Sequence, residues 1–103
     1  MIAMVESVGI DIDTKMQWVL DAALRKCTDY GGEITLCTET GRGYHIRLRL
    51  PRPLPYLESF VVRLKLGDDP YRILFDMRRY VAGAMTGIDV LFDAKAIYSR
   101  PLG

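Results

Sequence analysis

Apolar and polar residues alternate with a period of two in three stretches of the first half of the chain, residues 8–13, 33–38 and 44–50. This alternation is the pattern of a half-buried β-strand. In the first stretch Ile10 and Ile12 alternate with Asp11 and Asp13. A Gly-Arg-Gly turn at residues 41–43 separates the second and third stretches, so these two are expected to form a β-hairpin.

Helical spacing of apolar residues predicts two helices. The first lies between the first two strands, with Asp13 or Thr14 as its N-cap, and ends before Gly31. The second runs to about Leu66, after prolines at 51, 53 and 55 that we expect to end the sheet. The apolar positions are Met16, Val19, Leu20, Ala23, Leu24 and Cys27 in the first helix, and Leu57, Phe60, Val61 and Leu64 in the second.

Residues 71–78 fit two patterns. Apolar and polar residues alternate there, which favours a strand. Asp69 followed by Pro70 is also the start of a helix, with Ile73, Leu74, Met77 and Val81 as its apolar stripe. We favour the strand and expect a last strand at residues 88–92.

The expected order is therefore strand, helix, strand, strand, helix, strand, strand. The fold class that accommodates it is α+β, a ferredoxin-like or RRM-like, antiparallel-rich sheet with two helices on one face. Residues 1–103 are expected to form a single domain. The other face of the sheet is then uncovered, and its side chains are the candidates for function.

Composition narrows the function classes. Half of the residues are apolar and 26% are charged, which is typical of a globular domain. The net charge is +1, so any binding of nucleic acid must depend on local placement of basic residues. Cys27 and Cys37 are too few for a disulfide framework or a four-thiolate zinc site. Without a signal peptide or a long apolar run, we expect an intracellular, cytoplasmic protein with no membrane partner.

Strand periodicity places polar residues together on the uncovered face. Two carboxylates two residues apart repel each other, and a hard divalent cation such as Mg²⁺ or Mn²⁺ relieves that repulsion. Each residue also has a structural interpretation: an N-cap for the aspartates, a hydrogen-bonded strand histidine, and solvated arginines. The set comprises Asp11, Asp13, His45, Arg47 and Arg49, joined by Arg72, Asp76 and Arg78 if residues 71–78 form a strand.

Two segments resemble the core of the archaeo-eukaryotic primase superfamily. Residues 9–15, Gly-Ile-Asp-Ile-Asp-Thr-Lys, are similar to the family's strand-borne Asp-x-Asp motif, which a helix follows directly. Residues 40–46, Thr-Gly-Arg-Gly-Tyr-His-Ile, are similar to its Ser-Gly-x-x-Gly-Tyr-His turn and strand. A helix and one strand lie between the two motifs, as in that family. The resemblance covers residues 8–50, and the second half has the look of small archaeal or viral proteins.

The resemblance implies a primase-like nucleotidyltransferase in DNA replication, with Mg²⁺ or Mn²⁺ as cofactor and a nucleotide and single-stranded nucleic acid as partners. Its catalytic residues would be Asp11, Asp13 and His45. The metal ligands would be Asp11, Asp13 and a third carboxylate, Asp76, with Asp89 and Asp93 as alternatives. The phosphate-binding candidates are Arg42, Arg47, Arg49 and Arg72.

Two other functions stay open. The same sheet face suits a non-catalytic nucleic-acid-binding or replication-accessory module, in which arginines and aromatics hold phosphates and bases. The charged face also suits an interaction subunit of a larger replication assembly. An edge strand beside residues 51–55 is a place for a second copy to pair, which would give a homodimer.

Overall fold

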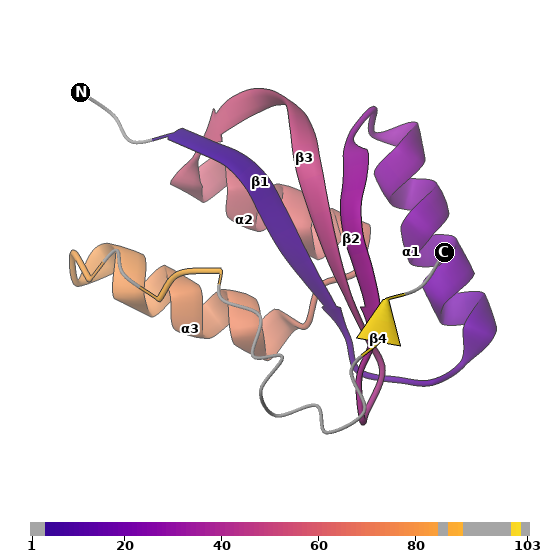
Figure 1. Cartoon of the computed structure of the whole chain (residues 1–103). Helices are drawn as coiled ribbons and strands as arrows, with labels where there is room; N and C mark the ends of the chain where they lie inside the picture. Colours follow the sequence, from indigo (N-terminus) through magenta and orange to yellow (C-terminus); the bar gives the residue numbers. More distant parts are fainter. Residues whose placement is uncertain (1–3, 85–86, 90–99, 102–103) are drawn as a thin grey trace.

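The sheet has the strand order β1-β3-β2-β4, and each neighbouring pair is antiparallel. The computed structural model describes residues 4–84, 87–89 and 100–101. Helices α1 and α2 cover one face of the sheet, and α3 lies beside α2 near the β1 edge (Figure 1). This confirms the α+β class and is compatible with a ferredoxin-like arrangement. The elements are β1 (Met4–Ile12), α1 (Gln17–Asp29), β2 (Glu33–Glu39), β3 (Tyr44–Pro55), α2 (Tyr56–Leu66), α3 (Pro70–Val81) and β4 (Arg100–Pro101).

The core lies between the sheet and the helices α1 and α2. Burial of each large aliphatic side chain contributes about 1.5–3 kcal/mol, so this layer supplies much of the stabilisation of the fold. The predicted inward face of the first and third strands is confirmed. The buried residues of this cluster are Val8, Ile10 and Ile12 of β1, Tyr44, Ile46, Leu48, Leu50 and Leu54 of β3, Leu20, Ala23 and Cys27 of α1, and Leu66 of α2.

Two details of the first half differ from expectation. The N-cap of α1 is Met16, without a side-chain cap, rather than Asp13 or Thr14. Met16 itself has an extended backbone, and before it Tyr44 Oη donates a hydrogen bond to the carbonyl of Lys15 (3.3 Å). The prolines at 51 and 53 also do not end the sheet, since β3 continues to Pro55. They are tolerated because β2 pairs with β3 only as far as Arg49, so one side of β3 has no neighbouring strand in the described chain.

Residues 70–81 form helix α3, so the strand prediction for 71–78 is wrong. Asp69 is the N-cap, its side chain accepts a hydrogen bond from the Tyr71 N–H (3.0 Å), and Pro70 occupies the first turn. These start signals outweigh an alternation that Leu74, an apolar residue at a polar position, interrupts. Residues 88–89 lie in a turn rather than in the expected last strand, and residues 90–92 lie outside the described residues.

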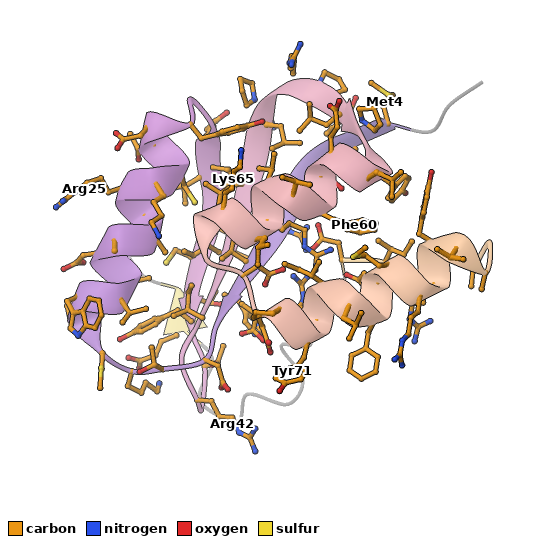
Figure 2. All side chains as sticks on the ribbon, turned by 180° about the vertical axis from the view of Figure 1, so that it is seen from behind. Met4, Arg25, Arg42, Phe60, Lys65 and Tyr71 are labelled. Atoms are coloured by element: carbon orange, nitrogen blue, oxygen red, sulfur yellow. The ribbon has the colours of Figure 1, made fainter. Side chains whose placement is uncertain are left out.

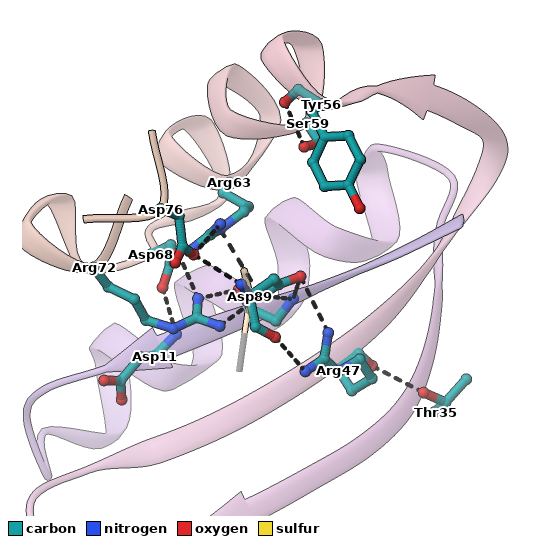
Figure 3. Close-up of polar contacts among 11 residues, drawn as sticks. Asp11, Thr35, Arg47, Tyr56, Ser59, Arg63, Asp68, Arg72, Asp76 and Asp89 are labelled. Atoms are coloured by element: carbon teal, nitrogen blue, oxygen red, sulfur yellow. Dashed lines mark hydrogen bonds and ion pairs between the residues drawn. The ribbon is translucent and has the colours of Figure 1, made fainter. Parts of the chain in front are cut away.

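Side chains occupy the free edge of β1 (Figure 3). The Gly9 N–H donates to both oxygens of Asp89 (3.0 and 2.9 Å), and the Asp11 N–H donates to Asp68 Oδ1 (2.8 Å). The Gly9 carbonyl accepts a hydrogen bond from Arg72 Nη1 (2.8 Å). The N–H groups of Gly9 and Asp11, which would otherwise pair with another strand, are thus satisfied within the chain. The edge beside residues 51–55, where a second copy is expected to pair, is a different part of the sheet.

These side chains belong to a buried ion network that joins α2 and α3 to β1. Arg63 of α2 is only 1% exposed, and it donates to Asp68 through Nε (2.8 Å) and to Asp76 through Nη1 (2.7 Å). Arg72 donates to Asp68 and Asp89, and Asp76 accepts from the Asp89 N–H (2.9 Å). Burial raises the pKa of Asp68, although Arg72 and Arg63 act in the opposite direction. Burial lowers the pKa of Arg72, but Asp68 and Asp89 outweigh this effect and leave it raised.

Replacing Arg63 by Met should destabilise the fold strongly. The substitution leaves the buried Asp68 and Asp76 carboxylates without their shared cation, which typically costs about 3–5 kcal/mol. Urea denaturation followed by circular dichroism measures this loss. The matched control is Arg49→Met, because Arg49 pairs with Glu33 where both side chains are about two-thirds exposed; it should cost less than about 1 kcal/mol. Equal, small losses from the two variants would contradict the structural role of the network.

The thiol of Cys27 gives a stability prediction with a defined pH window. Burial, together with the neighbouring Cys37, raises the pKa of Cys27 from 9.0 to about 11. Between these values the unfolded chain has lost the thiol proton while the folded chain keeps it. The free energy of unfolding should therefore fall as pH rises through this window. Denaturant titrations should show a shallower fall for Cys27→Ala than for the wild type. The same dependence of the free energy of unfolding on pH in both proteins would show that ionisation of the thiol is not coupled to folding.

Candidate functional site

The segments at residues 9–15 and 40–46 lie together at one end of the sheet. Asp11 on β1 and His45 on β3 are directly opposite in the strand register. The Asp11 N–H points away from β3, since it donates to Asp68. The pair is therefore a non-hydrogen-bonded one, in which side chains approach most closely. Asp11 Oδ1 lies 3.4 Å from His45 Nε2, and the side chains are 30% and 9% exposed, respectively.

The hairpin loop is built to fit against the end of β1. A Cβ on Gly43 would lie 1.7 Å from the Ile12 carbonyl oxygen, so only glycine fits at this close approach. Lys15 Nζ donates to the Thr40 carbonyl, and the Gly43 N–H donates to Thr40 Oγ1 (3.0 Å). The Thr-Gly-Arg-Gly sequence thereby fixes the hairpin beside the loop that carries Asp13.

Asp13 and Arg42 are exposed near this end of the sheet. Asp13 immediately follows β1, and Arg42 occupies the hairpin turn between β2 and β3. Figure 2 shows Arg42 at the end of the hairpin, pointing away from the helices. Both residues are thus accessible to a ligand that approaches the Asp11–His45 pair.

The expectation of a bare face is only partly correct. His45 and its β2 neighbour Thr38 are both 7% exposed, so the surface at this pair is covered. Thr38 Oγ1 is buried and finds no hydrogen-bond partner among the described residues. Arg49 is exposed, Arg47 and Asp11 are partly exposed, and the accessible part of the face therefore lies along β3 and β1.

A hollow of about 510 Å³ lies on this face, next to the proline-rich end of β3. A second hollow of about 340 Å³ shares its Glu6, Ser7 and Arg47 and extends toward α2. The first hollow is lined by three arginines and six other residues: Arg47, Arg49, Arg52, Glu6, Ser7, Thr35, Leu50, Pro51 and Pro53.

The arginines differ in their availability. Arg47 lies opposite Gly9 in the strand register, and the absence of a side chain at Gly9 lets its guanidinium reach Asp89 at the β1 edge. There it donates to the carboxylate and to the carbonyl of Asp89 (3.1 Å each). Arg49 makes a surface ion pair with Glu33 (3.3 Å), and Arg52 is exposed. Arg49 and Arg52 are therefore the cations that a ligand in the hollow would meet first.

The structure places Asp76 and Arg72 in the buried network rather than beside Asp13. Asp76 is 5% exposed, and its Oδ2 accepts from both Arg63 and the Asp89 N–H. This placement follows from the helix at 70–81, since the expected face assumed a strand. Asp89 belongs to the same network, and Asp93 lies outside the described residues. Asp68 contacts the candidate site instead, through the Asp11 N–H.

The two motif segments bring two carboxylates, Asp11 and Asp13, to this end of the sheet. Within the described residues, no three His, Cys, Asp or Glu side chains are grouped as metal ligands. Asp11 is partly exposed and Asp13 exposed, and Mg²⁺ is commonly held by one or two carboxylates together with waters and substrate phosphates. Asp11 and Asp13 thus suit an ion that arrives with a phosphorylated ligand rather than a metal enclosed by protein.

Sequence reasoning missed Arg63, Asp68 and Lys15. Arg63 stands on the buried face of a helix, and a charged residue there signals a buried partner. The sequence pattern marks Asp69 as a helix start and assigns no role to the adjacent Asp68. Asp69 has that role as a helix cap, whereas Asp68 holds the network and Asp11 together.

None of the helices in the described part of the chain has the length and apolar character needed to cross a membrane.

Comparison with known proteins assigns no family to this chain. Protein-family models, curated proteins and solved structures give no match to this chain.

Proposed function

We propose that this chain is a primase-related domain that binds nucleotides and single-stranded nucleic acid on the open face of its sheet. The observation that carries the proposal is the meeting of the two motif segments, with Asp11 Oδ1 3.4 Å from His45 Nε2. The motifs are more than thirty residues apart in the sequence, yet they form one cross-strand pair. The arginine-lined hollow continues along the same sheet face.

Phosphate binding would depend on a few local cations. Arg49 and Arg52 line the hollow and are exposed, and Arg42 stands at the hairpin turn. Guanidinium groups bind phosphate oxygens in bidentate geometry, which favours arginine at such positions. Because the net charge of the chain is only +1, binding should be local and sensitive to salt.

The end that carries Asp11, Asp13 and His45 supports nucleotidyl transfer as the proposed activity. A bound divalent ion would supply charge neutralisation of a triphosphate and activation of an attacking hydroxyl. Asp11 would fix the position of the His45 imidazole through their contact, and the exposed Arg42 of the hairpin turn would donate a hydrogen bond to a phosphate oxygen. Asp13, outside the pair and exposed, would be the second carboxylate of the site.

A non-catalytic binding module is the second candidate. It is favoured by the burial of His45 and by the placement of Asp76 in the ion network, since both reduce the groups available for chemistry. In this case Asp11 and His45 would only stabilise the end of the sheet. The arginine-lined hollow would then carry the whole function.

Binding of single-stranded DNA should depend on the arginines of the hollow. Fluorescence anisotropy with a labelled oligonucleotide at low salt should show at least ~10-fold weaker binding for Arg49→Glu/Arg52→Glu, with a shallower salt dependence. The control Arg25→Glu/Lys26→Glu makes the same charge change on the exposed surface of α1. It should leave binding nearly unchanged. An equal loss in both double variants, or no binding by the wild type, would contradict the proposed face.

Product formation tests the proposed chemistry separately. The wild type is incubated with Mn²⁺, labelled nucleotides and a single-stranded DNA template, and products are separated on a gel. Asp11→Asn should reduce product by at least ~100-fold, because it removes a carboxylate from the site. Asp21→Asn, on the exposed surface of α1, should not. DNA binding that is insensitive to EDTA, without product, would reject transfer and support the binding module.

A further inference from the structure

Helix α3 packs against the rest of the molecule through one of its sides. Ile73 and Asp76 on this side are buried, and Asp76 belongs to the ion network. The ring of Tyr80 lies against α2, with its centroid 5.5 Å from the ring centroid of Tyr56 and 6.0 Å from that of Phe60. This side of α3 therefore faces α2 and the sheet.

The opposite side of α3 is exposed and mostly apolar. Tyr71, Leu74 and Phe75 are 74%, 47% and 60% exposed, and Arg78 is exposed as well. At about 100° of rotation per residue, these four residues fall within an arc of about 100°, opposite to the side that packs inward. Figure 2 shows Tyr71 on the side of α3 that points away from α2. We call the four residues the α3 stripe.

The α3 stripe lies on a helix at the outside of the molecule. α3 is placed beside the β1 edge and packs on α2 (Figure 1). Its outer side is therefore accessible to another molecule along the length of the helix. Exposed apolar residues that adjoin one another mark an interaction site, and Arg78 is the one charged member of the stripe.

The α3 stripe is symmetric along the helix. Leu74 lies three residues after Tyr71, and Arg78 lies three residues after Phe75. A two-fold axis midway between Leu74 and Phe75 would therefore bring Tyr71 of each copy opposite Arg78 of the other. Leu74 of each copy would lie opposite Phe75 of the other. A guanidinium within about 6 Å of an aromatic ring is attracted to its face, so the stripe is complementary to itself.

We propose that α3 forms a homodimer contact, in which the α3 stripes of two copies pack antiparallel about this two-fold axis. A contact of this kind uses the same surface on both copies. An axis at Arg78 would instead bring two guanidinium groups together, which repulsion between like charges disfavours. The axis between Leu74 and Phe75 places the two apolar residues at the centre and the cation–ring pairs at the ends.

The size of α3 predicts a weak, reversible dimer. Its 12 residues span about 18 Å, and one helix pair covers much less than the about 800 Å² per partner of a standard interface. The contact is separate from the open sheet face and from the strand edge beside residues 51–55. The proposal therefore goes beyond the proposed function and stands without it.

Sedimentation equilibrium tests the proposal with the whole chain. The wild type should show a reversible monomer–dimer equilibrium between ~10 μM and ~1 mM. Phe75→Asp should raise the dissociation constant of the dimer at least ~10-fold, because it places a carboxylate at the apolar centre of the contact. Trp18→Asp is the control, since Trp18 is 69% exposed on α1. It should leave the dissociation constant unchanged.

An exchange of the two end residues tests the antiparallel register. Tyr71→Arg alone places arginines opposite each other at both ends, and it should weaken the dimer at least ~10-fold. The double variant Tyr71→Arg/Arg78→Tyr restores both cation–ring pairs with the positions exchanged. It should dimerise within ~3-fold of the wild type. Circular dichroism checks that each variant keeps the fold.

Three results would overturn the proposal. The first is a wild type that stays monomeric up to ~1 mM, or a dimer that Phe75→Asp leaves unchanged. The second is a double variant that dimerises no better than Tyr71→Arg, which would exclude the antiparallel pairing. The third is a monomeric wild type that co-sediments with phosphatidylserine vesicles while Phe75→Asp does not, which would assign the α3 stripe to a membrane surface.

Discussion

The buried ion network around Arg63 is the interaction on which the rest of the structure depends. Its carboxylates bind the free N–H groups of β1 at Gly9 and Asp11, and its arginines hold α2 and α3 against that edge. Charge that is removed from water must be paired, so these residues have few alternative arrangements. The network therefore fixes the backbone of Asp11 from one side while β3 and His45 fix it from the other. Asp89 of the network also accepts a hydrogen bond from Arg47, whose neighbour in the strand register, Gly9, has no side chain.

The same network explains why the helix pair has an inverted pattern. Arg63 and Asp76 occupy the inward faces of α2 and α3, where apolar residues are usually found. Apolar residues of these two helices, Phe75 among them, are therefore found on the outside. On the sheet, the arginine-lined hollow is accessible, whereas His45 is covered.

The sequence predicted the first half of this fold well because its signals are local and agree with one another. The alternation around Ile10 and Ile46 set the faces of β1 and β3, and the turn at residues 41–43 set the hairpin and hence the meeting of Asp11 with His45. The strand prediction for residues 71–78 is wrong because apolar alternation competes there with the helix cap at Asp69. The contacts of Arg63 with Asp68 and Asp76 belong to the tertiary structure, so local sequence patterns do not show them. The burial of His45 could not be predicted either, since strand periodicity assigns a side chain to a face without showing what covers that face.

Nuclear magnetic resonance mapping tests the central claim that the open sheet face handles phosphate-bearing ligands. The uniformly ¹⁵N-labelled chain is titrated with a short single-stranded oligonucleotide, and backbone amide shifts are followed residue by residue. The structure predicts the largest shift changes along β3 and the end of β1, at Asp11, His45, Arg49 and Arg52. Changes confined to α1 or to the outer surfaces of α2 and α3, with these strands unmoved, would contradict it.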